Sequence, residues 1–225
     1  MYTIINQVRS LLYNKPLALT VVRRLTPLPL LAKCRINDTF RLEGAVLDKL
    51  SLKDGQIFID IGSYVGTWSV WASKQVGSDG KVVAVEPDPI NFKMLLINIK
   101  KLKNIIPVNV ALWSENTTLN LFMSTYPTMH SLTKNYKRSY IKVKCLTLDS
   151  LIKSLNLSEV DALKIDVEGA ELEVLKGAKE TLKKLKWILV EIHNEKLRKK
   201  VSTLLKNESF ILYRINHRHV IGLRK

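Results

Sequence analysis

From residue 56 onward, short apolar runs alternate with segments of helical spacing, and this alternation restricts the fold more than any other feature. The alternation includes the apolar runs QIFIDIG, KVVAVEP, VDALKID and WILVEIH, each followed by a helix-like segment. Strands that are apolar along their whole length are buried on both faces, which is typical of a parallel sheet covered by helices. The pattern therefore predicts a doubly wound α/β domain, which we expect to span residues 51–225.

Three further segments refine this prediction. The run IIPVNVAL contains Pro107, which favours an edge or irregular strand because proline cannot donate a backbone hydrogen bond. Residues 114–146 contain TLNLFM and YIKVKCL, which alternate like the arms of a β-hairpin, so we expect an insertion after the third strand. The runs SFILYRI and HVIGLR predict a terminal pair of strands.

The charge of the chain favours anionic partners. There are 36 Lys and Arg residues against 20 Asp and Glu residues, so the formal net charge is +16. Such a surplus suits nucleic acid, an anionic lipid surface or a charged glycan. No acidic residue precedes Asp38, and residues 1–50 are predicted to form a basic helical extension. Residues 1–35 can contact an anionic membrane surface, although a helix packed on its own domain is the simpler interpretation.

The location follows from what the sequence lacks. No apolar run reaches the roughly 20 residues that cross a bilayer, and the first residues do not form a signal peptide pattern. The two cysteines, Cys34 and Cys145, match neither a metal-binding spacing nor a disulfide framework. We therefore expect a cytoplasmic protein, with peripheral attachment to a membrane as the variant that the basic start allows.

Acidic residues follow several of the predicted strands. In open α/β sheets, ligands bind beyond the carboxyl ends of the strands. The turn DIGSYVG lacks the middle glycine of a dinucleotide fingerprint, and the carboxylate of Asp60 would repel a pyrophosphate. Glu86 ends the second strand, where a carboxylate can accept hydrogen bonds from both ribose hydroxyls. These features favour S-adenosylmethionine, which carries a sulfonium charge and a ribose but no phosphate, over a nicotinamide cofactor.

Residues beyond the fourth and fifth strands are candidates for acid–base chemistry. Asp166 can orient the acceptor or the cofactor, and Glu168 can either accept a proton or begin a helix. His193 titrates near neutrality and is either a base or a structural residue. These three side chains can also hold a divalent ion, but no compact ligand motif is present, so no metal is predicted. His130 lies in the insertion, where surface placement is the simpler expectation.

The motifs FIDIGSYVGTWSVWASK, VVAVEPDP, VNVAL, LKIDVEGAELEVLKGA and ILVEIH resemble the FkbM family of S-adenosylmethionine-dependent methyltransferases, over roughly residues 56–195. The resemblance implies a Rossmann-like class I methyltransferase fold, with seven strands of which the last is antiparallel. It also implies methyl transfer, usually to a hydroxyl oxygen. By position, the cofactor would contact Asp60, Gly62, Ser63, Tyr64, Gly66, Glu86, Pro87, Asp88, Ala111, Leu112 and Asp166. Asp88 has a second interpretation, because Asp before Pro89 is a favourable helix N-cap.

Several functions remain open from the sequence. The acceptor hydroxyl can belong to a sugar, a lipid headgroup or a small metabolite. The basic composition suits an RNA methyltransferase, but the fourth strand ends in Asp166-Val-Glu-Gly, which lacks the prolines of amino-methylating enzymes, and no RNA-binding module is visible. A non-enzymatic membrane or scaffold module would explain the basic first residues, but not the acids gathered along one edge of the sheet.

Overall fold

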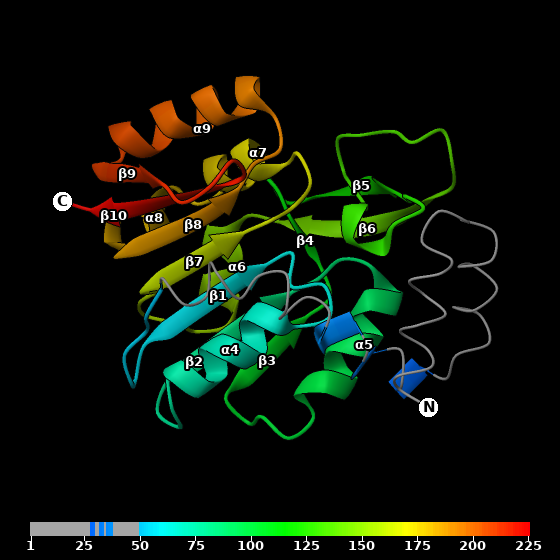
Figure 1. Ribbon diagram of the computed structural model, residues 1–225, viewed down its shortest axis with the longest axis horizontal. Coiled ribbons are helices and arrows are strands. Elements are labelled where there is room, and N and C mark those ends of the chain that lie inside the picture. The colour runs from blue at the N-terminus through cyan, green and yellow to red at the C-terminus, as the bar shows by residue number, and fades with distance from the viewer. Residues whose placement is uncertain (1–27, 30–31, 34, 38–49) are drawn as a thin grey trace.

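A computed structural model of the chain describes residues 28–29, 32–33, 35–37 and 50–225. Seven strands form the main sheet: β1 (Ile57–Ile61), β2 (Lys81–Val85), β3 (Ile105–Val108), β7 (Ala162–Ile165), β8 (Trp187–Glu191), β9 (Phe210–Arg214) and β10 (His219–Arg224). Their order is β3-β2-β1-β7-β8-β10-β9 (Figure 1). The first five of these strands pair in parallel, whereas β10 is antiparallel to both of its neighbours. The predicted doubly wound sheet with an antiparallel last strand is confirmed.

Alternate residues of the central strands point into two separate apolar cores. One face, which includes Ile59 and Leu163, packs against four helices: α6 (Leu148–Ser154), α7 (Glu171–Lys176), α8 (Lys179–Lys184) and α9 (Glu195–Asn207). The other face, which includes Phe58 and Ala162, packs against α4 (Thr67–Gln75) and α5 (Pro89–Ile99). Because both faces are covered, the strands carry apolar residues at nearly every position. The double burial holds the carboxyl ends of β1, β2, β7 and β8 in fixed positions.

The predicted insertion forms a second, smaller sheet beside the main one (Figure 1). It contains β4 (Ala111–Leu112), β5 (Thr117–Phe122) and β6 (Tyr140–Leu146), with a short 3₁₀ helix, η1 (Pro127–Met129), between β5 and β6. The strands β5 and β6 pair antiparallel from Thr117 opposite Cys145 to Phe122 opposite Tyr140, which confirms the predicted hairpin.

The expectation of one strand over IIPVNVAL is wrong in part. Its first half is β3, which pairs only with β2, so Pro107 lies on an edge strand as expected. Its second half is β4, which leaves the main sheet and pairs in parallel with β6. The chain turns between them because the Asn109 side chain donates hydrogen bonds to the carbonyls of Glu86 (2.7 Å) and Pro87 (3.1 Å).

The predicted N-terminal extension lies largely outside the described residues. The described parts at 28–29, 32–33 and 35–37 are helical, and Ala32 and Ile36 pack with Val65 and with Met94 of α5. The proposed membrane contact of residues 1–35 falls mostly on residues that the structure does not describe. Within the described part of the chain, every helix is too short or too polar to cross a membrane.

Candidate functional site

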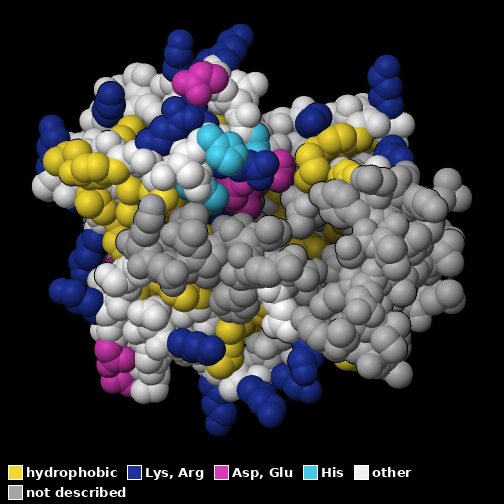
Figure 2. Space-filling view, in the orientation of Figure 1, with side chains coloured by type: hydrophobic (Ala, Val, Ile, Leu, Met, Phe, Trp, Pro, Cys, Tyr) yellow, Lys and Arg dark blue, Asp and Glu magenta, His cyan; other side chains and the backbone are white. Residues whose placement is uncertain are grey.

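A cavity of about 340 Å³ lies where the carboxyl ends of the central strands meet the insertion. Such a volume is in the range of small-molecule pockets. Figure 2 shows acidic, basic and histidine side chains gathered at the upper centre of one face, between the main sheet and the insertion. Ten of the predicted site residues line the cavity: Gly62, Ser63, Tyr64, Glu86, Pro87, Ala111, Leu112, Asp166, Glu168 and His193. Asp60, Gly66 and Asp88 are not among the lining residues, so their direct contact with a cofactor stays a prediction.

The glycines of the first turn are required by neighbouring elements. Gly62 has φ +76°, and a Cβ atom placed there would lie 1.8 Å from the carbonyl oxygen of Asp166. The ends of β1 and β7 are joined at this point, because the Asp166 amide donates a hydrogen bond to the Ile61 carbonyl at 3.0 Å. Gly66 has φ +91°, and a Cβ atom there would meet Leu95 of α5 at 2.6 Å. Gly66 therefore permits close packing of the turn against helix α5.

Glu86 is a buried carboxyl group whose oxygens are held by backbone amides. Its Oε2 accepts from the Tyr64 amide at 2.9 Å, and its Oε1 accepts from the Asp88 amide at 3.0 Å. Burial nevertheless raises the pKa of Glu86 to about 8. Ribose hydroxyls donating to this group would favour its ionised form, because hydrogen bonds to a carboxylate stabilise the charge. The site thus suits the ribose contact predicted from the sequence.

Asp88 follows two residues later and begins helix α5. Its Oδ1 accepts from the amides of Ile90 (2.9 Å) and Asn91 (2.7 Å), which is the N-cap arrangement. The capping interpretation of Asp88 is confirmed.

A buried lysine joins the first and fourth strands, and sequence reasoning missed it. Lys164 Nζ lies 3.6 Å from Asp60 Oδ1 and 3.5 Å from Asp166 Oδ2, and it donates to the Gly62 carbonyl at 3.2 Å. Asp60 is fully buried and also accepts from Ser69 Oγ at 2.6 Å. The available signal was a lysine inside the apolar strand ALKI, because a buried ammonium group requires partners of opposite charge.

His193 lies between two carboxyl groups at the end of β8. Its Nε2 atom is 3.6 Å from Glu168 Oε1 and 3.5 Å from Glu191 Oε1. Burial lowers the pKa of His193 despite the attraction of Glu191, so the imidazole is neutral at neutral pH. Burial and the nearby carboxylates of Glu191 and Glu171 raise the pKa of Glu168 to about 7. Two groups able to exchange a proton near neutrality therefore face each other in the cavity.

Glu191 organises a second group of residues that the sequence did not assign to the site. Its side chain lies 3.3 Å from His219 Nε2 and 3.7 Å from Arg218 Nη1. These contacts exist because His219 pairs directly opposite Glu191 in the antiparallel β8–β10 ladder. The attraction of His219, with smaller contributions from Lys164 and His193, outweighs burial and lowers the pKa of Glu191 to about 2. Glu191 is therefore a permanent anion beside His193.

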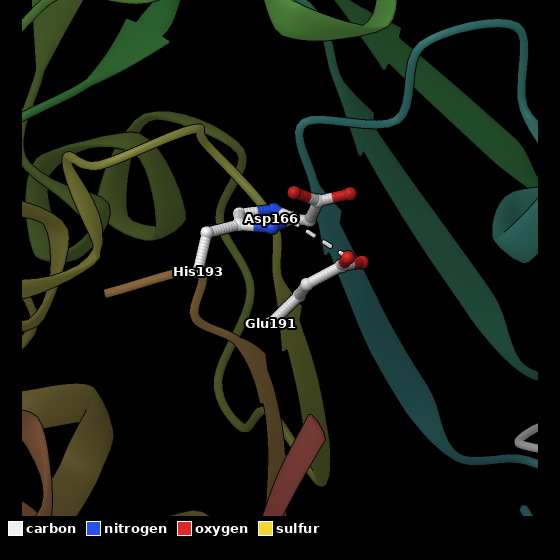
Figure 3. Close-up of side chains that lie close together, drawn as sticks. All are labelled: Asp166, Glu191 and His193. Atoms are coloured by element: carbon white, nitrogen blue, oxygen red, sulfur yellow. Dashed lines mark ion pairs between the residues drawn. The ribbon is translucent and has the colours of Figure 1, made fainter. Parts of the chain in front are cut away.

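Asp166, Glu191 and His193 approach closely enough to form a candidate metal-binding group (Figure 3). One ligand atom of each lies within 4.8 Å of the others. The sequence grouped Glu168 with Asp166 and His193 instead. Both carboxylates of the group already have close partners: Asp166 Oδ2 lies 3.5 Å from the ammonium group of Lys164, and Glu191 Oε2 lies 3.3 Å from His219 Nε2. A divalent ion would compete with these neighbours, so the arrangement suits proton transfer better than metal binding.

The insertion closes the opposite side of the cavity. His130 lines the cavity with a side chain that is 9% exposed, so the expectation of surface placement was wrong. Its Nδ1 accepts from the Ser124 amide at 2.9 Å, and burial lowers its pKa. Two hydrogen bonds hold the insertion in place: Asn91 Nδ2 donates to the Pro127 carbonyl at 3.1 Å, and Ser131 Oγ donates to the Glu168 carbonyl at 2.7 Å.

Several buried polar atoms of the cavity wall call for a polar ligand. Among the described residues, Ser63 Oγ, Thr67 Oγ1 and Asn91 Oδ1 have no hydrogen-bond partner. Buried polar atoms are normally satisfied, so these atoms fit a ligand rich in hydroxyl, amino and carboxyl groups. Another part of the wall is apolar and suits a flat base, with contributions from Pro87, Val110, Leu121 and Leu132. Together with Glu86, the wall suits an adenosine-containing molecule.

Comparison with known proteins agrees with this reading of the cavity. Residues 60–214 match the family model described as the methyltransferase FkbM domain, which is well over half of the 225-residue chain. The chain belongs to the FkbM methyltransferase family. FkbM proteins use S-adenosylmethionine, so family membership identifies the cofactor. Glu86 and the buried polar atoms without a hydrogen-bond partner are suited to this molecule. Membership in this enzyme family also removes the support for a non-enzymatic scaffold.

Relatives and solved structures place the FkbM chain among methyltransferases. It is 27% identical over 176 residues to the hexuronic acid methyltransferase AglP of Haloferax volcanii, with 72% of each chain covered. It is 32% identical over 99 residues to the ribosomal RNA large subunit methyltransferase E of Buchnera aphidicola, covering 41% of this chain and only 46% of that protein.

The fold is also similar to that of two solved enzymes. They are a precorrin-6y C5,15-methyltransferase from Geobacter metallireducens and Aeropyrum pernix fibrillarin with bound S-adenosylmethionine, each with a TM-score of 0.53 and 16% identity. The matches cover 82% and 81% of this chain and 88% and 73% of those chains, respectively. At this identity the likeness shows a class I methyltransferase fold.

Proposed function

We propose that this FkbM protein is an O-methyltransferase that methylates a hydroxyl group of a sugar, with His193 as the base. The observation that carries the proposal is the pair formed by His193 and Glu168 in the cavity wall, at a separation of 3.6 Å. The pKa of His193 is lowered by burial and that of Glu168 is raised to about 7. His193 is therefore neutral and able to accept a proton, and Glu168, with a pKa near neutrality, is suited to pass that proton on.

The residues divide the chemistry between them. When bound, S-adenosylmethionine supplies an electrophilic methyl group on its sulfonium sulfur. His193 Nε2 would take the proton of the acceptor hydroxyl, which leaves the oxygen nucleophilic toward that methyl group. The imidazolium that results is stabilised by the carboxylate of Glu191, 3.5 Å away. Glu168 then accepts the proton from His193 and passes it to solvent. Asp166, held by Lys164, orients the acceptor.

The choice of a sugar acceptor is supported by the relative from Haloferax volcanii, which is named for methylation of a hexuronic acid and matches 72% of this chain. The RNA alternative has weaker support, because the ribosomal RNA methyltransferases match at most 41% of the chain. Lipid headgroups and small metabolites are further hydroxyl acceptors that the same site chemistry accommodates.

Methyl transfer from radiolabelled S-adenosylmethionine to a panel of uronic acids, neutral sugars and RNA tests the proposal. We expect product from a sugar and a loss of about 10²–10⁴-fold in kcat for His193→Asn, with unchanged affinity for the cofactor in calorimetric titration. His217→Ala is the matched control, because His217 is exposed and does not line the cavity. Methylation of RNA but of no sugar would overturn the assignment of a sugar as the acceptor. Full activity of His193→Asn would overturn the assignment of His193 as the base.

A further inference from the structure

Two positively charged residues from separate elements lie near Glu168, which lines the cavity. Arg218 lies in the turn between β9 and β10 and lines the cavity, and its side chain is 53% exposed. Lys134 lies in the insertion and is exposed. Both side chains lie close enough to Glu168 to lower its pKa, in opposition to the carboxylates around it. Glu168 therefore has one positive group near it from the main sheet and another from the insertion.

The backbone around each cation is held firmly. The Arg218 amide donates to Asn216 Oδ1 at 2.8 Å, and the Arg218 carbonyl accepts from the Ile192 amide at 2.9 Å. The Lys134 amide donates to Ser131 Oγ at 3.1 Å, and the same hydroxyl donates to the Glu168 carbonyl. Both positive side chains therefore extend from fixed backbone, which lowers the entropic cost of ordering them around a ligand.

The guanidinium group of Arg218 has unused hydrogen-bonding capacity. Its contact with Glu191 spans 3.7 Å, and within the part of the chain that the structure describes it donates no hydrogen bond. Glu191 has a closer partner in His219, at 3.3 Å. Asp166, a half-buried carboxylate of the cavity wall, has the ammonium group of Lys164 beside it. Both acids thus have closer partners than Arg218, whose guanidinium group keeps donors for a ligand.

We propose that Arg218 and Lys134 form a subsite for the carboxylate of an acidic sugar acceptor. The planar guanidinium group of Arg218 binds a carboxylate through two parallel N–H···O bonds, and Lys134 adds a point charge from the opposite rim. The carboxylate is held beside His193, so a hydroxyl group elsewhere on the same sugar ring lies within the cavity. The subsite rests on the proposed function, because it specifies the class of sugar that the enzyme methylates.

Binding of small probes tests the subsite without reference to turnover. We would titrate the protein, saturated with S-adenosylhomocysteine, with glucuronate, glucose and glucose 1-phosphate, and follow binding by ligand-observed NMR. Wild-type protein is expected to bind glucuronate at least about tenfold more tightly than glucose. Arg218→Gln should reduce glucuronate affinity by about tenfold or more and leave glucose affinity unchanged. Lys134→Gln should have a smaller effect that decreases with added salt, because its charge is exposed.

Lys142→Gln is the matched control. Lys142 is an exposed residue of β6 in the insertion and does not line the cavity, so the variant removes one positive charge outside the proposed subsite. Equal binding of glucuronate and glucose, or glucuronate affinity that Arg218→Gln leaves unchanged, would overturn the subsite. Tighter binding of glucose 1-phosphate would overturn the choice of a carboxylate in favour of a phosphate. If the enzyme methylated neutral and acidic sugars equally well, the subsite would be overturned, whereas the proposed O-methyltransferase function would stand. Arg218-dependent binding of glucuronate without methylation of any sugar would support the subsite and overturn the proposed function.

Discussion

Substitution of Gly62 by alanine should damage stability and cofactor binding together. Two costs combine at this position. The backbone has φ +76°, and an L-residue in the left-handed region costs about 1–2 kcal/mol. The new Cβ atom would also lie 1.8 Å from the Asp166 carbonyl oxygen, so the ends of β1 and β7 must separate, and overpacking of this kind costs about 1–3 kcal/mol. We expect Gly62→Ala to lower the free energy of unfolding by about 2–5 kcal/mol.

The chain contains a control that separates the two costs. Gly55 has a similar φ of +80°, but a Cβ atom there would meet nothing within 4 Å. Gly55→Ala should therefore show the backbone cost alone, about 1–2 kcal/mol. Urea unfolding of both variants gives the free energies, and titration with S-adenosylmethionine gives the affinities. The steric reasoning is refuted if Gly62→Ala is no less stable than Gly55→Ala, or if only Gly55→Ala loses cofactor affinity.

Three other perturbations test the site. Lys164→Met leaves Asp60 and Asp166 without their shared cation and should lower the free energy of unfolding by about 3–5 kcal/mol in urea. Glu86→Ala should weaken S-adenosylmethionine binding by roughly 100-fold in calorimetry, because it removes the ribose acceptor, whereas the exposed Glu180→Ala should have no effect. The pKa of Glu168 is raised to about 7 from 4.5, so the folded state holds the proton of Glu168 more tightly than the unfolded chain does. The contribution of Glu168 to stability therefore falls as the pH rises between those two values. Glu168→Gln should therefore gain stability relative to wild type from pH 5 to pH 8 in thermal unfolding, and an unchanged difference across that range would contradict the burial of this carboxyl group.

Much of the fold follows from local patterns in the sequence. Continuous apolar runs predicted the central strands, alternation predicted the hairpin, and Pro107 predicted the edge strand, because each of these features depends on residues close together in the chain. The departure of β4 from the main sheet was missed, since it depends on the side chain of Asn109 bonding to the distant segment at Glu86. Within the described residues, the main sheet nevertheless has the seven strands that the family resemblance implied.

Site residues that end a strand or lie in one turn were predicted from the sequence. Contacts that form only where two distant strands meet were missed. Glu86 and Asp166 were identified because each ends a strand. The pairing of Glu191 with His219 depends on the register of β10 against β8, which no local pattern specifies. Burial of His130 depends similarly on how the insertion folds back toward α5. Lys164 was overlooked because its neighbours in the strand are apolar, although its charge was itself the signal.

The hairpin β5–β6 has a consequence for how enzymes of this kind diversify. The small sheet is joined to the main one through the two-residue strand β4 and a few side-chain hydrogen bonds, among them those from Asn91 and Ser131. Its sequence and length can therefore change while both apolar cores stay intact, because neither core is built chiefly from it. Exchanging residues 117–146 between relatives would replace one wall of the cavity, including Leu121, His130 and Leu132, while the main sheet keeps Glu86 and the first turn. Selection, or a protein engineer, can therefore reshape this wall without rebuilding either core.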